Sequence, residues 1–185
     1  LDNGAVLLLM ERHDVPLITF TAMLRGGAMT DPPNRSGVAS LLAGMLEKGA
    51  GKRDALQFAE TVASVGGSIQ TDASTENVLV SGSFLARDQA LMVELLADLL
   101  QRPRLERSEF DSLRARQIEF IRAAKESNLQ SLISIYADTA LFGSHPYGRS
   151  VSGSETELAA IAYEDLQRSY QEEFGADRLI LAVAG

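Results

Sequence analysis

The stretch SGVASLLAGMLEKG (Ser36–Gly49) contains the most apolar helical pattern of the chain. Ser36 is of a residue type that caps helix N-termini, and glycine commonly ends a helix, as Gly49 does here. Between them, the first charged residue is Glu47. The sequence therefore predicts an apolar helix over Gly37–Lys48, with Ser36 as its N-cap.

Segments of strand character lie on both sides of this helix. Leu17–Arg25 is rich in β-branched and aromatic residues, and Ser68–Thr71 with Asn77–Phe84 forms a predicted hairpin. Further strands are expected at Ala5–Glu11 and Leu179–Val183, and further helices at Asp54–Val65, Arg87–Leu100, Glu106–Glu126, Leu129–Phe142 and Tyr163–Phe174, with a short turn at Glu155–Ile161. Strands and helices do not alternate regularly, so we expect an α+β fold with an antiparallel or mixed sheet and helices on one side.

Composition excludes several classes of site. The 185 residues include no cysteine and only two histidines, His13 and His145. The chain therefore has no disulfide, catalytic thiol or cysteine-ligated zinc. The net charge of −8 argues against nucleic acid as a partner, and no apolar run is long enough for a membrane span. Localisation stays open between periplasm, envelope and cytoplasm.

Local motifs do not identify a common enzyme class. Gly49–Lys52 resembles a phosphate-binding loop, but Leu46 replaces its first glycine and Arg53 replaces the residue that would hold magnesium. The chain has no Gly-x-Ser-x-Gly nucleophile elbow. His145 precedes Pro146, and we expect it to have a loop or capping role.

Several segments, in order along the chain, resemble the pitrilysin/insulinase superfamily of zinc peptidases (peptidase M16), in particular its branch similar to the mitochondrial processing peptidase. They are Leu1–Gly4, Val15–Leu17, Arg25–Ala28, Asp31-Pro32, Ser36–Ala39, Gly66-Gly67, Phe84-Leu85, Leu95–Leu100 with Pro103, His145–Gly148 and Leu179–Gly185. The resemblance implies a LuxS/MPP-like metallohydrolase domain. We expect residues 1–185 to form one N-terminal peptidase-like domain of a longer chain, whose second half is absent here.

The zinc motif of that family is altered in this chain. Active members carry His-x-x-Glu-His on the helix that follows, where two histidines four residues apart bind Zn²⁺ and the glutamate activates a water molecule. The aligned positions here are Ser40, Ala43 and Gly44. Alanine and glycine have no ligating side chain, and a serine hydroxyl is a poor zinc ligand at neutral pH. The sequence therefore predicts that the zinc site is lost and that no cofactor is bound.

The third family ligand, a glutamate on a later helix, aligns with Phe120, or with Glu119 if the register shifts by one. Ser40, Ala43 and Gly44 are small, whereas Phe120 is large. We therefore expect the ring of Phe120 to fill the space left by the zinc and its ligands, so that dry packing replaces the metal site.

The resemblance implies a catalytically inactive partner subunit, which completes a peptide-binding chamber with an active M16 subunit and holds an extended peptide. Two alternatives remain. The first is an active zinc peptidase in which His13 and His145 converge with Glu47 or Glu119. The second is a scaffold that forms homodimers through its helical face.

Overall fold

The computed structural model describes residues 1–127 and 129–185, without the side chains of residues 127–132 and 134–136. The strands of the main sheet are β1 (Val6–Met10), β2 (Leu17–Arg25), β5 (Ser68–Ala73), β6 (Asn77–Leu85) and β7 (Leu179–Ala184). The helices are α1 (Val38–Leu46), α2 (Ala55–Ser64), α3 (Gln89–Gln101), α4 (Arg107–Ser127), α5 (Leu129–Phe142), α6 (Glu155–Ala160) and α7 (Tyr163–Glu173). Gly49–Ala50 (β3) and Arg53–Asp54 (β4), of two residues each, pair in an antiparallel ribbon.

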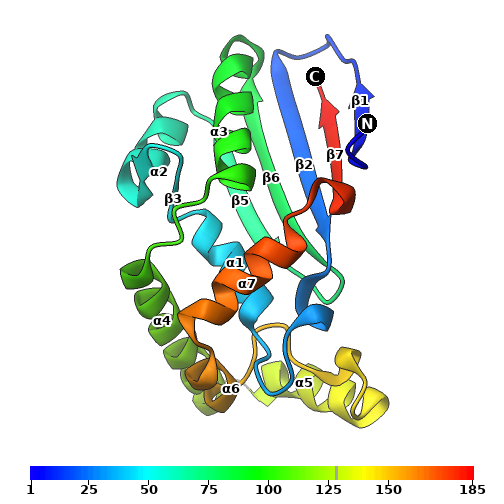
Figure 1. Ribbon diagram of the computed structural model, residues 1–185, viewed down its shortest axis with the longest axis vertical. Coiled ribbons are helices and arrows are strands. Elements are labelled where there is room, and N and C mark those ends of the chain that lie inside the picture. Colours follow the sequence, from blue (N-terminus) through cyan, green and yellow to red (C-terminus); the bar gives the residue numbers. More distant parts are fainter. Residues whose placement is uncertain (128) are drawn as a thin grey trace.

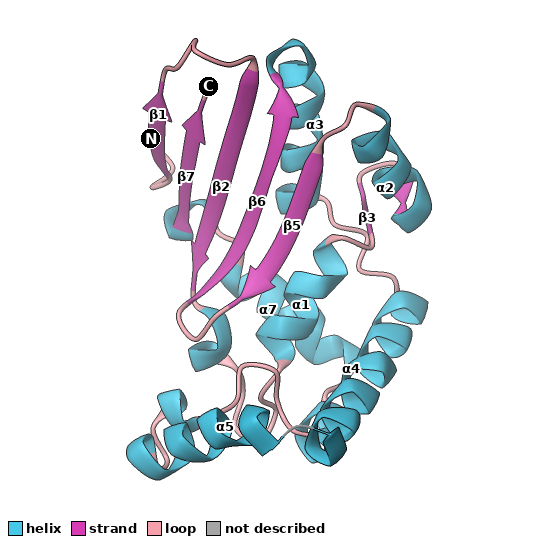
Figure 2. Ribbon diagram, turned by 180° about the vertical axis from the view of Figure 1, so that it is seen from behind, coloured by secondary structure: helices cyan, strands magenta, loops and turns pink. Residues whose placement is uncertain are grey.

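The five main strands form one mixed sheet in the order β1-β7-β2-β6-β5. β1 pairs with β7 in parallel, and the other neighbours are antiparallel. Helices α3 and α7 lie in front of the sheet in Figure 1, whereas no helix crosses the strands in the opposite view of Figure 2. The predicted α+β class, with a mixed sheet and helices on one side, is confirmed.

Side-chain alternation along the strands explains why only one face of the sheet is covered. On β2, Ile18, Phe20 and Ala22 are buried, and the residues between them are exposed. Period-two alternation places these buried side chains on one face, where they join Val78 and Val80 of β6 in the main core. The opposite face therefore needs no helix to cover it.

Helix α1 lies between two apolar clusters. Ala39, Ala43 and Leu46 belong to the cluster that contains the sheet, and Leu41 and Leu42 belong to a second cluster with residues of α4, α6 and α7. A helix that packs on opposite sides must be apolar nearly all round, which accounts for its sequence. None of the described helices combines the length and apolar character of a membrane span.

The predicted N-cap of α1 is wrong. The N-cap residue is Gly37, with φ of 106°, and the Ser36 hydroxyl donates to Glu157 instead. The carboxylate of Asp31 accepts hydrogen bonds from the N–H groups of Gly37 and Ala39, at 2.7 and 2.9 Å. The carboxylate of a loop residue thus satisfies the free N–H groups at the start of α1 in place of the N-cap side chain. The residue types next to the helix do not reveal this contact.

Candidate functional site

Helix α4 packs against the side of α1 that carries Ser40 and Gly44. The Ser40 hydroxyl accepts a hydrogen bond from Nε2 of Gln117 at 3.2 Å, and Gln117 also donates to the carbonyl of Ser152 at 2.9 Å. A Cβ atom at Gly44 would lie 2.9 Å from Cδ2 of Leu113. The missing side chain at position 44 therefore allows the close approach of the two helices.

Ala43 is nearly inaccessible and packs in the cluster that contains the sheet. Its carbonyl accepts a hydrogen bond from the hydroxyl of Thr71 on β5, at 2.7 Å. A glutamate at this position would place a carboxylate in a dry, tightly packed region, at a large desolvation cost. Thus Ser40 and Gly44 contact α4, and Ala43 contacts β5.

The prediction that Phe120 fills this space is wrong. Its side chain is 72% exposed. The residues of α4 that face α1 and the second cluster include Phe110, Leu113, Gln117 and Ile121. Phe120 follows Leu113 by nearly two helical turns and points in a similar direction, but it borders the hollow beside the loop before α6 instead of packing on α1. Glu119 is also exposed and pairs with Arg122 at 2.7 Å. Apolar spacing within α4 indicates Leu113 but includes Phe120 as well, and no sequence signal identifies the polar Gln117.

The alternative zinc site is also wrong, because its residues do not converge. His13 is exposed in the loop after β1 and contacts Glu11 at 2.9 Å. His145 follows α5, at the opposite end of the molecule in Figure 1, where its Nδ1 accepts from the N–H of Tyr147. This confirms its predicted capping role. Glu47 contacts Thr71. Within residues 1–127 and 129–185, no group of three His, Asp or Glu side chains is placed to hold a metal ion.

Two buried carboxylates lie near the start of α1. Burial raises the pKa of Asp31 to about 6, although the N–H donors of Ala39 and Gly37 favour its charged form. Burial also raises the pKa of Glu173 on α7, which accepts hydrogen bonds from the hydroxyls of Thr30 and Ser169. The negative charge of Glu173 contributes to the raised pKa of Asp31. Asp31 thus fixes the first turn of α1, and Glu173 links α7 to Thr30.

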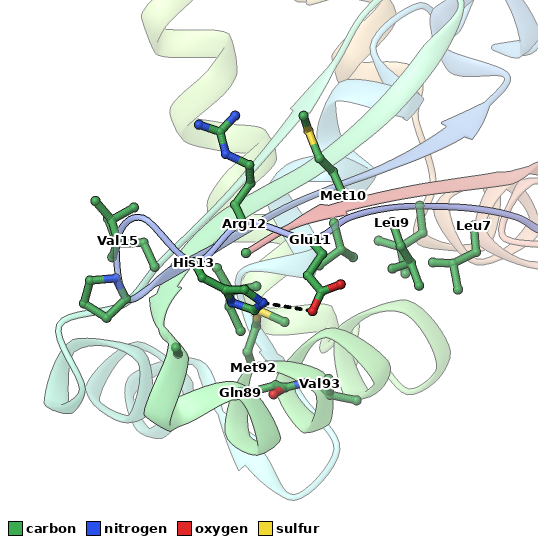
Figure 3. A pocket seen from close by; sticks show the side chains of 17 residues that line it. Leu7, Leu9, Met10, Glu11, Arg12, His13, Val15, Gln89, Met92 and Val93 are labelled. Atoms are coloured by element: carbon green, nitrogen blue, oxygen red, sulfur yellow. Dashed lines mark hydrogen bonds and ion pairs between the residues drawn. The ribbon is translucent and has the colours of Figure 1, made fainter.

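Large hollows lie at opposite ends of the described part of the chain. One, of about 650 Å³, is lined by Phe120, Tyr147, Ser152 and neighbouring residues between α4, α5 and the loop before α6. The other, of about 900 Å³, lies between β1 and α3. Figure 3 shows Leu7 and Leu9 of β1 on one side of it, and Met92 and Val93 of α3 on the other. Neither hollow presents a cluster of metal ligands among its described residues.

Comparison with known proteins gives a family match over most of the chain. Residues 11–155 match the family described as "Insulinase (Peptidase family M16)". A "Non-peptidase homolog YmxG" of Helicobacter pylori is 23% identical over 175 residues, which cover 95% of this chain and 40% of that protein. A "Mitochondrial-processing peptidase subunit beta" of Lentinula edodes is 23% identical over 187 residues, which cover 100% of this chain and 40% of that protein.

A solved structure confirms the similarity of fold. The crystal structure of a peptidase M16 inactive domain from Pseudomonas fluorescens has a TM-score of 0.93 and 21% sequence identity. The superposition covers 99% of this chain and 44% of that one. The chain thus spans about two fifths of the length of the proteins it matches.

Proposed function

The chain belongs to the insulinase family (peptidase family M16), and from this premise we propose that it is a catalytically inactive zinc-peptidase homologue. Its role is that of a non-catalytic partner, which completes a peptide-binding chamber together with an active subunit of the same family. Residues 1–185 form one peptidase-like domain of a longer protein. The share of the relatives' length that the chain spans supports this last point.

The observation that carries the proposal is the packing of the motif positions. In an active relative, zinc chemistry requires two histidines and a glutamate on α1. Here Ala43 and Gly44 have no ligating side chain, Leu113 packs against Gly44, and Ser40 is engaged by Gln117. These residues do not fit a zinc ion, and no catalytic step through zinc follows from them. The names of the H. pylori and P. fluorescens proteins, which call them a non-peptidase homologue and an inactive domain, support the same reading.

Metal analysis tests the loss of zinc. We expect the purified chain, incubated with zinc and then dialysed, to retain far less than one zinc ion per chain. A stoichiometric zinc ion that a chelator removes would contradict the proposal.

Reconstitution tests the partner role. The chain is mixed with a relative that carries an intact His-x-x-Glu-His motif, and the mixture is analysed by gel filtration with light scattering. We expect a complex of fixed stoichiometry whose peptidase activity exceeds that of the relative alone. If the chain forms only homodimers, or no complex at all, the partner role is wrong.

A further inference from the structure

Strand β5 is an edge strand of the sheet, and it lies next to α1, the helix that carries Ser40, Ala43 and Gly44. It is the last strand in the order β1-β7-β2-β6-β5, and its hydroxyl-bearing Thr71 donates to the carbonyl of Ala43 on α1. Figure 2 shows β5 as the outermost strand on the side of α2. An extended peptide commonly binds by adding a strand to such an edge. The outer backbone groups of β5 therefore determine whether a peptide can bind beside α1.

The pairing with β6 shows which backbone groups of β5 point outward. The N–H of Ser74 donates to the carbonyl of Asn77, so residue 74 faces β6. In an antiparallel pair, successive residues point alternately toward the partner strand and away from it. Ile69, Thr71 and Ala73 consequently direct their N–H and carbonyl groups to the outer side, where a further strand would pair, and Thr71 is the central residue of the three.

A carboxylate already occupies the central position. The N–H of Thr71 donates to Oε1 of Glu47 at 2.7 Å, and the hydroxyl oxygen of Thr71 lies 2.9 Å from the same atom. Glu47 is the C-cap residue of α1, so the helix fixes its backbone directly opposite β5. A hydrogen bond to a charged acceptor is about twice as strong as one between neutral groups. A peptide carbonyl competes poorly with this carboxylate.

We propose that Glu47 closes the β5 edge against strand addition. An arriving strand has to place a carbonyl oxygen opposite the N–H of Thr71, where the Glu47 carboxylate both fills the position and repels the incoming oxygen. The other two outward-facing residues, Ile69 and Ala73, lie on either side of Thr71, so a strand cannot pair with both of them without meeting Glu47. The proposal rests on the proposed function only for the choice of an extended peptide as the excluded ligand.

Three variants test the contact itself. Glu47→Ala removes the acceptor, Glu47→Gln retains a neutral one, and Glu60→Ala removes a glutamate from the exposed side of α2 as a control. In amide hydrogen exchange followed by NMR, we expect the Thr71 N–H of E47A to exchange about tenfold faster than in the wild type, because the lost hydrogen bond is to a charged group. E47Q is expected to lie between the two, and E60A to match the wild type.

Peptide binding tests whether Glu47 keeps a further strand from pairing with β5. The probe is a labelled nonapeptide with the sequence of residues 77–85, the segment that already pairs antiparallel with β5 from the inner side. We expect E47A to bind it about tenfold more tightly than the wild type does, with new exchange protection at Ile69, Thr71 and Ala73. The same peptide with N-methyl groups on alternate amides should not bind, because it cannot form the ladder.

The outcomes separate cleanly. Unchanged exchange at Thr71 in E47A, or faster exchange without tighter peptide binding, overturns the proposal. If E47A does not fold, Glu47→Asp takes its place, since its carboxylate is one methylene short of the Thr71 N–H. Complex formation with an active relative is a separate measurement that does not use the peptide. A failed partner role and an open β5 edge are therefore distinguishable.

Discussion

At residue 44, the absence of a side chain determines how closely α4 approaches α1. A Cβ atom there would meet Cδ2 of Leu113 at 2.9 Å, which is the end of a flexible side chain. We expect Gly44→Ala to be nearly neutral, because better helix propensity offsets a small shift of Leu113. Gly44→His, the family's own residue, should destabilise the fold by about 1–3 kcal/mol through overpacking. Urea unfolding of the two variants measures the difference, and an equally stable G44H would refute the packing argument.

Asp31 makes stability depend on pH. Its pKa rises from 3.8 unfolded to about 6 folded, mainly through burial, so the folded protein favours the protonated form. The stabilisation from this proton is complete below pH 3.8 and is lost as the pH rises through 6. It amounts to about 3 kcal/mol over the full titration.

The matched variant for this effect is Asp31→Asn, which keeps one acceptor for the N–H groups of Gly37 and Ala39 but does not titrate. We expect the free energy of unfolding of the wild type, minus that of D31N, to fall between pH 4 and pH 7. The parallel comparison with Glu173→Gln separates the contribution of the neighbouring carboxylate, whose pKa burial also raises. A pH-independent difference for D31N would contradict the assignment.

At the scale of elements, helix α4 carries one apolar side chain that is packed and another that is exposed. Phe120 is 72% exposed, whereas Leu113 packs against Gly44 and the second cluster. We expect Phe120→Ala to change the free energy of unfolding by less than about 0.5 kcal/mol, as exposed positions do. Leu113→Ala should cost about 1–3 kcal/mol, since it is only partly buried. Thermal or urea unfolding of this matched pair measures the difference, and the reverse ranking would contradict the packing of Leu113 against α1.

The sequence predicts the elements better than their contacts. The bounds of β2 and α5 are confirmed at both ends, because β-branched composition and apolar periodicity are local signals. The sequence does not reveal the contacts of Asp31 and Gln117, because their partners, Gly37 and Ser40, lie on other elements. The sequence places Phe120 on nearly the same side of α4 as Leu113, seven residues earlier, and only the packing of the helices shows that Leu113 is covered and Phe120 is exposed. The loss of metal ligands, by contrast, follows from the family resemblance together with the residue types at positions 40, 43 and 44.

At the scale of the whole molecule, the helices cover the sheet unevenly. Helix α3 packs on β6, whereas the β1 side of the same face borders the hollow of about 900 Å³. All five side chains of β1 are apolar, and they are 40–72% exposed. Of these, Leu7, Leu9 and Met10 line the hollow together with Val15, Leu17 and Val93, which gives a more extended apolar surface than scattered exposed residues usually provide. We therefore expect this surface of the folded chain to bind a hydrophobic dye.

We expect the folded chain to bind anilinonaphthalene sulfonate at this surface, although such binding usually reports loose packing. Leu9→Lys places an ammonium group at the most exposed leucine of β1, beside the hollow shown in Figure 3, and should lower dye fluorescence. Leu56→Lys on α2 is the matched control, since Leu56 is equally exposed but lies away from β1. Both substitutions should change the free energy of unfolding by less than about 0.5 kcal/mol, because neither side chain is buried. If L56K lowers the fluorescence as much as L9K, the dye does not report the β1 surface, and the apolar hollow is not the preferred site.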